Sequence, residues 1–455
     1  MLEPVAKPKD EIELMSPKIS VIGTGYLGAT HAACMAELGF EVIGLDVDPV
    51  KIARLSEGKL PFHEPGLPEL LVKHVNSGRL RFTTSYEEVG AWADIHFIGV
   101  GTPQRSEDGG ADLRYVDAAV VSLAENITKD ALIVGKSTVP VGTARRLKDL
   151  LKAHARSGAD VELAWNPEFL REGFAVKDTL TPDRLVIGTE SPRAEATLRE
   201  VYAAALERDT PLVVTDFETA ELVKVAANAF LATKISFINA FAEVTETVGG
   251  DIRTLADAIG YDERIGRKFL NAGVGFGGGC LPKDIRALQA RASELGLHRT
   301  MDFLDDVDDI NLRRRGRVVT LAHQLLDNSV ANKRIAVLGV AFKPDSDDVR
   351  DSPALDIAGQ LYNQGADVTV YDPEGNANAE RRFPRLRYVD STEAATANAD
   401  LVLLLTEWKE FRSLQPDELS GFVAGKRIID GRNVLAHAEW EAAGWTVAAL
   451  GRKFG

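Results

Sequence analysis

The feature that most constrains the fold is a glycine-rich turn near the start of the chain. An apolar run at residues 19–22 leads into the pattern Gly-x-Gly-x-x-Gly at residues 23–28, and an alanine-rich stretch of helical spacing follows to residue 38. Glycines at this spacing permit a tight turn, allow the backbone to approach a pyrophosphate, and let the helix pack closely on the preceding strand. The order of strand, glycine turn and helix therefore predicts a dinucleotide-binding α/β unit.

An acidic residue indicates which dinucleotide this unit takes. Asp46 follows the next apolar run, residues 41–45, and lies 18 positions after Gly28. A carboxylate at the end of the second strand accepts hydrogen bonds from the adenosine ribose and repels a 2′-phosphate, so the sequence favours NAD over NADP. Lys51, one turn into the following helix, either contacts the same nucleotide or is solvated.

Two further turns are expected beside the dinucleotide, because ligands of an open α/β sheet bind beyond the carboxyl ends of its strands. The predicted strand 94–100 runs into Gly101, and the predicted strand 131–134 runs into a turn that contains Thr138. The residues predicted to border NAD are Gly23, Gly25, Tyr26, Leu27, Gly28, Asp46, Lys51, Gly101, Thr102, Pro103 and Thr138.

Three more apolar runs, residues 161–164, 184–188 and 212–214, complete a first α/β domain near residue 215. Between the first two of these runs lie Glu168 and Glu172, which are spaced four apart. On a helix, two carboxylates at this spacing share a face, and both would then point into one pocket. The alternative is a solvated acidic turn.

The chain changes character at residue 216. Residues 217–248 contain no proline and have apolar residues at helical spacing, which predicts one helix that bridges domains or forms a dimer seam. Lys224 and Asn228 share one face of it, and such polar groups are costly to bury without a purpose. The alternative is a snorkelling lysine beside a capped amide. The charge runs 305–309 and 313–317 indicate solvated or intersubunit surface.

A second glycine-rich stretch, residues 271–284, contains a cysteine. Glycines crowd the positions before Cys280, and Lys283 and Asp284 follow it by one helical turn. A run with so few side chains cannot build a core, so it is predicted to bring backbone against a ligand or to hold positive φ angles. Cys280 is then a candidate nucleophile. The alternative is a flexible loop followed by an ordinary buried cysteine.

The last third of the chain repeats the plan of the first α/β domain. Apolar runs at residues 334–338, 367–371, 401–405 and 427–429 alternate with helical segments, and Asp372 repeats the acid after the second strand. The turn after the first of these runs lacks the three glycines and carries Phe342 and Lys343 instead, which suits a nucleotide other than NAD. The expected fold class is α/β, with two Rossmann-like domains joined by a long central helix and an all-α dimerisation region.

Length and composition fit this organisation. A chain of 455 residues predicts several domains, and we divide it into a disordered lead (1–16), an NAD-binding domain (17–215), a central helical dimerisation domain (216–330) and a second nucleotide-binding domain (331–455). The net charge of −15 argues against nucleic acid and anionic membranes as partners, because both need a basic face.

The compartment is inferred from the cysteines and from the apolar runs. Only two cysteines are present, 246 positions apart, and no secretory signature precedes them, so we expect a reducing cytoplasm and no structural disulfide. No uninterrupted apolar run reaches the length of a membrane span. No metal site is expected.

With these motifs in order, the sequence resembles the nucleotide-sugar 6-dehydrogenases, the UDP-glucose/GDP-mannose dehydrogenase family, over residues 17–440. The resemblance rests on the glycine turn with Asp46, on Lys224 and Asn228, and on the glycine-rich stretch with Cys280. It implies a dimer built on the long helix. It also implies NAD-dependent oxidation of a sugar C6 alcohol to a carboxylate in two steps, with UDP-glucose as the expected substrate.

The resemblance further implies roles for individual residues. Cys280 matches a nucleophile that traps the C6 aldehyde as a thiohemiacetal and then carries a thioester, and its sulfur is expected to be thiolate-like. Lys224 and Asn228 match the groups that stabilise an oxyanion. The family has a set of acid–base residues that organise water, and Thr138, Glu168 and Asp284 match that set. Positions on the cofactor side match Glu172, Lys283 and Arg350.

The resemblance also supplies a set of substrate contacts. These are Glu168, Phe169, Leu170, Arg171, Glu172, Lys224, Asn228, Arg264, Asn271, Gly275, Phe276, Gly277, Phe342, Lys343 and Arg432. Cations in this set suit a diphosphate and sugar hydroxyls. Arg264 matches an arginine that reaches the substrate of the neighbouring subunit, and Asn271 stands where the animal enzymes have lysine.

Three alternatives remain open. In the first alternative the substrate is GDP-mannose or a UDP-N-acetylhexosamine instead of UDP-glucose. The segment 280–284 does not decide this, because it is common to the UDP-glucose and GDP-mannose branches of the family. The second is a β-hydroxyacid dehydrogenase, which shares the glycine turn and the Lys-x-x-x-Asn helix but needs neither Cys280 nor a second nucleotide domain. The third, a non-catalytic nucleotide-binding protein, has no reason to keep a reactive cysteine with these neighbours.

Overall fold

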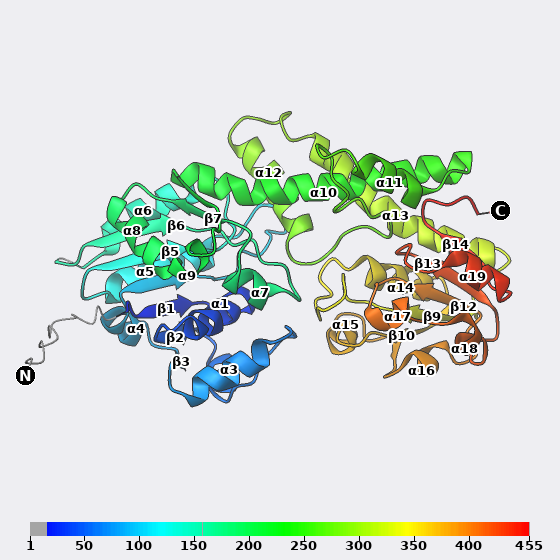
Figure 1. The fold of residues 1–455 in the computed structure, drawn as a ribbon, viewed down its shortest axis with the longest axis horizontal. Coiled ribbons are helices and arrows are strands. Elements are labelled where there is room, and N and C mark those ends of the chain that lie inside the picture. The colour runs from blue at the N-terminus through cyan, green and yellow to red at the C-terminus, as the bar shows by residue number, and fades with distance from the viewer. Residues whose placement is uncertain (1–15, 157, 455) are drawn as a thin grey trace, which may run out of the picture.

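A computed structural model describes residues 16–156 and 158–454. Two α/β lobes lie side by side, and the long helix α10 (Phe217–Val248) extends across both of them (Figure 1). This is the fold class that the sequence predicts. The lead predicted over residues 1–16 falls, apart from Ser16, outside the described residues.

The first lobe is built on an eight-stranded sheet in the order β3-β2-β1-β4-β5-β6-β7-β8. Its strands are β1 (Ile19–Ile22), β2 (Val42–Leu45), β3 (Leu80–Thr83), β4 (Ile95–Ile98), β5 (Ala131–Gly135), β6 (Val161–Trp165), β7 (Leu185–Gly188) and β8 (Leu212–Thr215). Only β6 and β7 pair antiparallel, and the other neighbouring strands are parallel. The strand order reverses between β1 and β4, and their carboxyl ends therefore flank a crevice suited to a dinucleotide.

Helices cover both faces of this sheet. They are α1 (Tyr26–Glu37), α2 (Pro49–Ser56), α3 (Leu67–Asn76), α4 (Tyr86–Trp92), α5 (Arg114–Asn126), α6 (Thr143–His154), α7 (Ala175–Leu180), α8 (Pro192–Val201) and α9 (Ala203–Leu206). One apolar cluster joins α1, α3 and α8 to the sheet, and a second joins α4, α5 and α6 to it. Continuous burial on two faces explains why these strands read as unbroken apolar runs.

The helix predicted over residues 217–248 is confirmed at both ends. α10 begins after Asp216, whose carboxylate accepts a hydrogen bond from Thr219 N, and it ends at Gly249, which has φ +81°. Both are common helix boundaries. The central region continues with α11 (Ile252–Gly260), α12 (Leu281–Glu294) and α13 (Phe303–Leu325).

By length and composition, α10 is apolar enough to cross a membrane. Its inner face instead packs against α12 and α13, where Ala229 and Ala232 meet Phe276, Ile285 and Leu304. We therefore describe α10 as the core helix of the central region.

The second lobe repeats the strand order of the first in a six-stranded parallel sheet, β11-β10-β9-β12-β13-β14. Its strands are β9 (Arg334–Leu338), β10 (Asp367–Tyr371), β11 (Arg387–Tyr388), β12 (Leu401–Leu404), β13 (Arg427–Asp430) and β14 (Thr446–Ala449). Its helices are α14 (Pro353–Asn363), α15 (Asn376–Arg382), α16 (Thr392–Thr396), α17 (Lys409–Arg412), α18 (Pro416–Ser420) and α19 (His437–Ala442).

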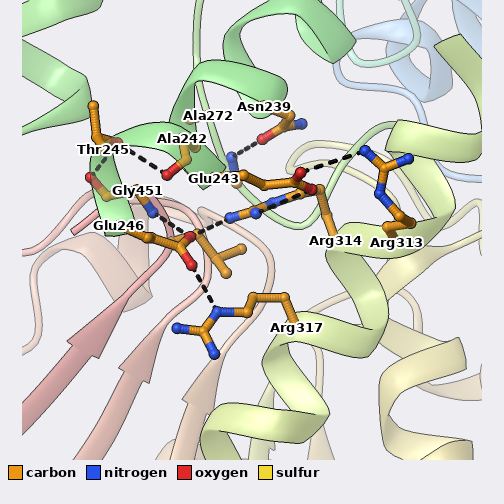
Figure 2. Close-up of polar contacts among 12 residues, drawn as sticks. Asn239, Ala242, Glu243, Thr245, Glu246, Ala272, Arg313, Arg314, Arg317 and Gly451 are labelled. Atoms are coloured by element: carbon orange, nitrogen blue, oxygen red, sulfur yellow. Dashed lines mark hydrogen bonds and ion pairs between the residues drawn. The ribbon is translucent and has the colours of Figure 1, made fainter. Parts of the chain in front are cut away.

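Part of the charge run 313–317 is buried, so its interpretation as solvated or intersubunit surface was wrong there. Arg314 is fully buried and pairs with Glu246 at 2.6 Å, and Arg317 pairs with the other oxygen of Glu246, also at 2.6 Å. Gly451 N donates to the same carboxylate at 2.8 Å (Figure 2). A buried charge needs such partners, and these partners tie the end of the chain to α10 and α13.

Candidate active site

The turn after β1 has the geometry that a pyrophosphate requires. Gly23 has φ +86°, which side chains disfavour, and a Cβ at Gly28 would lie 1.8 Å from the carbonyl oxygen of Gly23. Gly25 precedes α1 and gives no side-chain cap to its first turn. The N–H groups and the dipole of α1 are therefore available to an anion. These residues fit the pyrophosphate of NAD.

Asp46 anchors the same turn from the end of β2. Its carboxylate accepts hydrogen bonds from Thr24 N at 2.9 Å and from Lys51 Nζ at 2.7 Å. Burial disfavours the charge, but Lys51 and the N–H donors outweigh burial and lower the pKa of Asp46. An ionised acid at this position is what excludes a 2′-phosphate. Lys51 pairs with the acid, and its contact with the nucleotide stays a prediction.

Glu64, which we did not predict, joins the glycine turn to the loop after β6. Its buried carboxylate accepts hydrogen bonds from the Tyr26 hydroxyl and, at 2.7 Å each, from Gly173 N and Ala175 N. Burial and Glu64 raise the pKa of Tyr26, so the phenol remains a donor. The signal in the sequence was a carboxylate inside the turn His63-Glu-Pro-Gly66, where nothing local explains it.

The candidate centre lies where α10 meets the start of α12. Lys224 is buried on α10 and pairs with Glu168 Oε1 at 3.0 Å. One turn further along, Asn228 Nδ2 donates to Asp284 Oδ2 at 2.6 Å, and Lys283 Nζ lies 2.8 Å from Asp284 Oδ1. Five of the predicted residues are thus brought together from a loop and two helices.

Cys280 is the N-cap residue of α12 and borders this centre. Cys280 is exposed to solvent at the edge of the centre, although many protein groups surround its thiol. Burial and Glu168 raise the pKa of the thiol to about 12, against the lowering effect of Lys224. The expectation of a thiolate-like sulfur was therefore wrong for this structure, because desolvation and the surrounding carboxylates outweigh the ammonium.

Lys224 remains a cation in this surrounding. Burial disfavours its charge, but Glu168, Cys280 and Asp284 outweigh burial and raise the pKa of Lys224 above its ordinary value. A fixed cation inside a largely dry site is the kind of group that stabilises a developing oxyanion.

Glu168 and Glu172 do not share a helical face, because residues 166–172 form no helix. Glu168 Oε2 accepts a hydrogen bond from Leu170 N at 2.5 Å, a local contact that competes with helical hydrogen bonding. The helical interpretation was therefore wrong. Glu168 faces Lys224, and Glu172 faces the second lobe.

Glu172 is the main contact between the two lobes at the centre. Ser346 Oγ donates to its carboxylate at 2.9 Å, Arg350 lies 3.6 Å from it, and Lys343 Nζ donates to its carbonyl oxygen at 2.6 Å. Burial and the nearby Asp348 raise the pKa of Glu172 to about 7. Three predicted residues, Lys343, Arg350 and Glu172, therefore meet across the lobe boundary.

The predicted cofactor side is also assembled. Thr102 Oγ1 donates to the carbonyl oxygen of Thr138 at 2.8 Å, and Lys283 Nζ lies 3.5 Å from Thr102 Oγ1. The turns after β4 and β5 are therefore neighbours, and α12 reaches both of them. Gly101 and Pro103 are exposed at the end of β4.

The residues matched to the substrate fall on both sides of Cys280. Phe169 lies beside Lys224, whose Nζ is 5.7 Å from the centre of the ring, and Arg184 stacks on the same ring at 3.8 Å. Phe342 comes from the second lobe and lies against Gly278, where a Cβ would approach its ring to 2.8 Å.

Arg432, which was matched to the substrate, binds backbone groups of the protein in this structure. Its guanidinium donates to the carbonyl oxygens of Leu405 at 2.7 Å, Gly275 at 3.0 Å and Phe342 at 3.1 Å. Glu407 also lies 3.2 Å from it. In this structure Arg432 fixes the backbone around the centre, so its contact with a diphosphate stays a prediction.

Arg171 and Arg264 are not part of the assembled centre. Arg171 pairs with Asp178 at 2.6 Å. Arg264 is exposed, and its only salt bridge among the described residues is with Asp262, at 2.7 Å. An arginine that extends from the surface in this way does not complete the site of its own chain.

A buried polar cluster behind the centre was also missed. Lys136 Nζ donates to Asn166 Oδ1 at 2.9 Å, and the Tyr202 hydroxyl donates to the same oxygen at 2.5 Å. Burial lowers the pKa of Lys136 to about 8. Lys136 and Asn166 stand two residues before Thr138 and Glu168, respectively. The available signal was a polar residue directly after each apolar strand.

Known proteins share this arrangement along most of the chain. Residues 17–206 match the NAD binding domain of the UDP-glucose/GDP-mannose dehydrogenase family, residues 218–313 match its central domain, and residues 336–437 match its UDP binding domain. The chain belongs to this family. Because the match includes the central and UDP binding domains, the β-hydroxyacid dehydrogenase alternative loses its support.

Individual members are similar over nearly their full length. A UDP-glucose 6-dehydrogenase of Rhizobium meliloti (strain 1021) is 42% identical over 438 residues, which are 96% of this chain and 99% of that protein. A solved UDP-glucose dehydrogenase from Pyrobaculum islandicum has a TM-score of 0.89 and 37% identity, and covers 99% of this chain and 100% of its own. A UDP-D-ManNAc dehydrogenase from Pyrococcus horikoshii has a TM-score of 0.82 and 28% identity, with coverage of 96% and 99%.

Family membership confirms the predictions of a dehydrogenase fold with an NAD-binding domain and a second, UDP-binding domain. It does not test the individual site residues. The geometry above is therefore the observation on which their roles depend.

Proposed function

We propose that this protein oxidises the C6 alcohol of UDP-glucose to the carboxylate of UDP-glucuronate, with NAD as the oxidant and Cys280 as the nucleophile. The observation that carries the proposal is the placement of Cys280. It caps α12 between an NAD-binding lobe and a UDP-binding lobe, and the Lys224–Glu168 ion pair borders it. The names of the relatives support the choice of sugar.

Residues on the N-terminal lobe would hold the cofactor. The turn 23–28 and the start of α1 would bind the pyrophosphate, and Asp46 would bind the adenosine ribose. Thr102, Thr138 and Lys283 would border the nicotinamide side. Bound NAD supplies the hydride acceptor for each of the two oxidations.

In the first oxidation C6 loses a hydride, and its hydroxyl proton passes to a carboxylate of the centre, which gives an aldehyde. The Cys280 thiol then adds to that aldehyde. A C–S bond forms, the thiol proton leaves to one of the carboxylates that border it, Glu168 or Asp284, and the carbonyl oxygen becomes the oxygen of a thiohemiacetal. Lys224 and Asn228 would stabilise the charge on this oxygen.

The second oxidation removes a hydride from the thiohemiacetal carbon and leaves a thioester. An sp³ carbon can release this hydride, which is the reason for covalent capture. Water then attacks the thioester, the C–S bond breaks, and the sulfur regains a proton as the carboxylate leaves. Thr138, Glu168 and Asp284 would orient and deprotonate that water.

The decisive experiment measures NADH formed per sugar consumed. Purified protein is incubated with NAD and UDP-glucose, and the expected ratio is two. A ratio of one would remove the thioester mechanism. In Cys280→Ser we expect net turnover to be lost while UDP-glucose still binds, and near-normal turnover of that variant would remove the assignment of the nucleophile.

A UDP-N-acetylhexosamine is a second candidate substrate, and the similarity to the UDP-D-ManNAc dehydrogenase of Pyrococcus horikoshii favours it. GDP-mannose is a third, because the family includes GDP-mannose dehydrogenases by name. The same assay with each sugar separates the three. Turnover with only one of the alternatives would replace UDP-glucose in the proposal.

The protein is further proposed to be a homodimer formed through the outer face of α10. This face carries an apolar stripe at spacings of seven, four, three and four residues, formed by the exposed side chains of Phe230, Phe237, Phe241, Val244 and Val248. Such a stripe matches a helix–helix seam. Arg264, which extends from the surface, would then reach the neighbouring centre.

Light scattering on the wild type and on Phe241→Glu tests the dimer. We expect a dimeric mass for the wild type, a smaller mass for the variant and loss of activity with dissociation, because Arg264 no longer completes the partner's site. A monomeric and fully active wild type would contradict this proposal.

The two free cysteines support a cytoplasmic location for the protein.

A further inference from the structure

The glycine-rich segment 271–279, called here the 271–279 loop, is held almost entirely through its backbone. Two N–H groups of the loop bind carbonyl oxygens of the second lobe. Val274 N donates to Gly431 O at 3.0 Å, and Gly278 N donates to Arg350 O at 2.8 Å. From the central helices, the buried Asn239 and Asn311 bind the backbone of Gly273 and Phe276. The loop thus spans the boundary between the helices that carry Lys224 and the UDP-binding lobe.

Asn311 on α13 makes the more extensive of these contacts. Its Oδ1 accepts from Phe276 N at 2.7 Å, and its Nδ2 donates to Phe276 O at 3.0 Å. One side chain thereby satisfies both backbone groups of one residue. The neighbouring Gly275 has φ +95°, and a Cβ there would lie 2.2 Å from Asn311 Oδ1. The contact and the glycine therefore require each other.

Asn239 on α10 makes the second contact. Its Oδ1 accepts from Gly273 N at 2.9 Å, a contact that Figure 2 draws beside Ala272. Asn239 is fully buried, and its Nδ2 finds no hydrogen-bond partner among the described residues. An unpaired buried amide costs free energy. That cost is hard to explain by packing alone, whereas the bond to the loop explains why the side chain is polar.

Asn239 also lies on the same helical face as the candidate catalytic residues. From Lys224 the face continues through Asn228 and then, in steps of three or four residues, to Asn239. One rigid helix therefore carries both the oxyanion groups and one anchor of the loop. Any shift of the loop along α10 changes its position relative to Lys224.

We propose that Asn311 and Asn239 are positioning residues that fix the 271–279 loop for binding of the nucleotide sugar. This inference rests on the proposed function, in which the loop contacts the sugar. The asparagines do not touch the substrate themselves. They hold Gly273 and Phe276 so that the backbone of the loop meets it, and so that Cys280 follows at a fixed position.

A buried hydrogen bond elsewhere on the same helices supplies the matched control. Ser236 Oγ on α10 donates to the carbonyl oxygen of Val307 on α13 at 2.6 Å, and Ser236 is as buried as Asn311. Ser236→Ala removes a buried contact between α10 and α13 without touching the loop. Loss of stability alone should therefore affect the control and the asparagine variants alike.

The experiment compares Asn311→Ala, Asn239→Ala and Ser236→Ala with the wild type in steady-state kinetics. We expect KM for UDP-glucose to rise ten-fold or more in N311A, and less in N239A, with KM for NAD within two-fold of the wild type. S236A should leave both constants unchanged. Equal increases in both KM values, or an unchanged KM for UDP-glucose, would overturn the inference.

Direct binding separates this inference from the proposed function. Calorimetric titration with UDP and with UDP-glucose, without NAD, should show weaker binding to N311A than to S236A. If the wild type has no dehydrogenase activity, the proposed function fails, and the titrations still decide the inference. Equal affinities would overturn it. If N311A does not fold, Asn311→Asp replaces it, because the aspartate keeps the acceptor for Phe276 N. We then expect an intermediate loss of affinity. Wild-type affinity of this variant would contradict the inference.

Discussion

Neutralising Glu168 is the sharpest test of the electrostatics of the centre. In Glu168→Gln the side chain keeps its shape, and an oxygen can still accept the hydrogen bond from Leu170 N. The change removes the negative charge that lies 3.0 Å from Lys224 Nζ, and it replaces the oxygen that faces Lys224 by an amide NH2 group. Both side chains are largely buried, so water cannot replace the lost partner. Lys224 is left as an unpaired buried ammonium.

The size of the effect follows from the distance and the burial. At 3.0 Å and an effective dielectric constant of about 20, the attraction is about 5.5 kcal/mol. Breaking a buried pair by removing one partner typically costs about 3–5 kcal/mol. We expect Glu168→Gln to lower the free energy of unfolding by this amount at pH 7. Lys224 has a raised pKa, so its ion-pair contribution is fully present below the ordinary lysine pKa and is lost only as the pH rises through the higher folded value.

Urea unfolding of E168Q, of K224M and of the double variant measures the coupling. The double variant should lose less stability than the sum of the single variants, because the second change removes the orphaned charge. Glu218→Gln is the matched control on α10, since Glu218 pairs with Arg145 at the exposed surface, where a pair is worth about 1 kcal/mol or less. Additive effects, or a loss in E168Q no larger than in E218Q, would refute the argument.

The same variant has a second readout at Cys280. Glu168 is the largest charge effect that raises the pKa of this thiol. Its neutralisation should lower that pKa, and each unit of lowering gives a ten-fold larger thiolate fraction at neutral pH. Alkylation by iodoacetamide should accordingly be faster in E168Q than in the wild type. An unchanged rate at all pH values would show that burial alone keeps the thiol neutral.

Three further predictions concern the cofactor, the lobe boundary and the second lobe. In Asp46→Ser, the loss of the acid frees Lys51, and the ratio of kcat/KM for NADP to that for NAD should rise roughly ten-fold or more, about 1.4 kcal/mol, with an unchanged ratio as the contrary result. Glu172 has a pKa raised to about 7, so the folded state binds more protons than the unfolded state between the ordinary glutamate pKa and 7; urea midpoints should fall as the pH rises through this window, more steeply in the wild type than in E172Q, where Glu221 still titrates, and equal slopes would contradict this. Asp372→Asn should cost about 3 kcal/mol in unfolding of the second lobe, because several N–H groups lose a charged acceptor; near-wild-type denaturation would contradict this.

Much of the fold could be predicted from the sequence because local signals and tertiary contacts agree there. The apolar run 19–22 became β1 without a shift, and the helix expected over 217–248 has those bounds in the structure. The misses are short or weakly apolar segments. β11 has two residues, and β14 reads Thr-Val-Ala-Ala, so neither carries a periodic pattern that stands out from a loop.

The site was less predictable because its properties depend on contacts between distant segments. Spacing placed Glu168 and Glu172 on one helix face, but the segment is not helical, and Glu168 pairs with Lys224 whereas Glu172 binds the second lobe. The resemblance assigns Lys224 and Cys280 to the same reaction. Nothing in the sequence indicates which carboxylates lie close enough to raise the pKa of the Cys280 thiol. The burial of Arg314 likewise depends on Glu246, which lies 68 positions away.

The acid that ends the second strand is used differently in the two lobes. Asp46 accepts from Thr24 N and Asp48 N, and also from Lys51, a partly exposed side chain that can move aside for a ribose. Asp372 is fixed by donors that cannot move. Four are backbone N–H groups and one is the indole of Trp408; the backbone donors belong to Val340, Ala341, Glu374 and Gly375.

The helix that follows each first turn differs as well. α1 begins at Tyr26, three residues after Gly23, and points its uncapped N–H groups at the turn. α14 begins at Pro353, 14 residues after Gly339, and the side chain of Ser352 caps it. The second turn therefore lacks the free helix N-terminus that the first turn offers to a pyrophosphate. The inserted segment instead carries Phe342, Lys343 and Arg350 to the boundary between the lobes. One fold thus forms the NAD-binding domain in the first lobe and borders the candidate active site from the second.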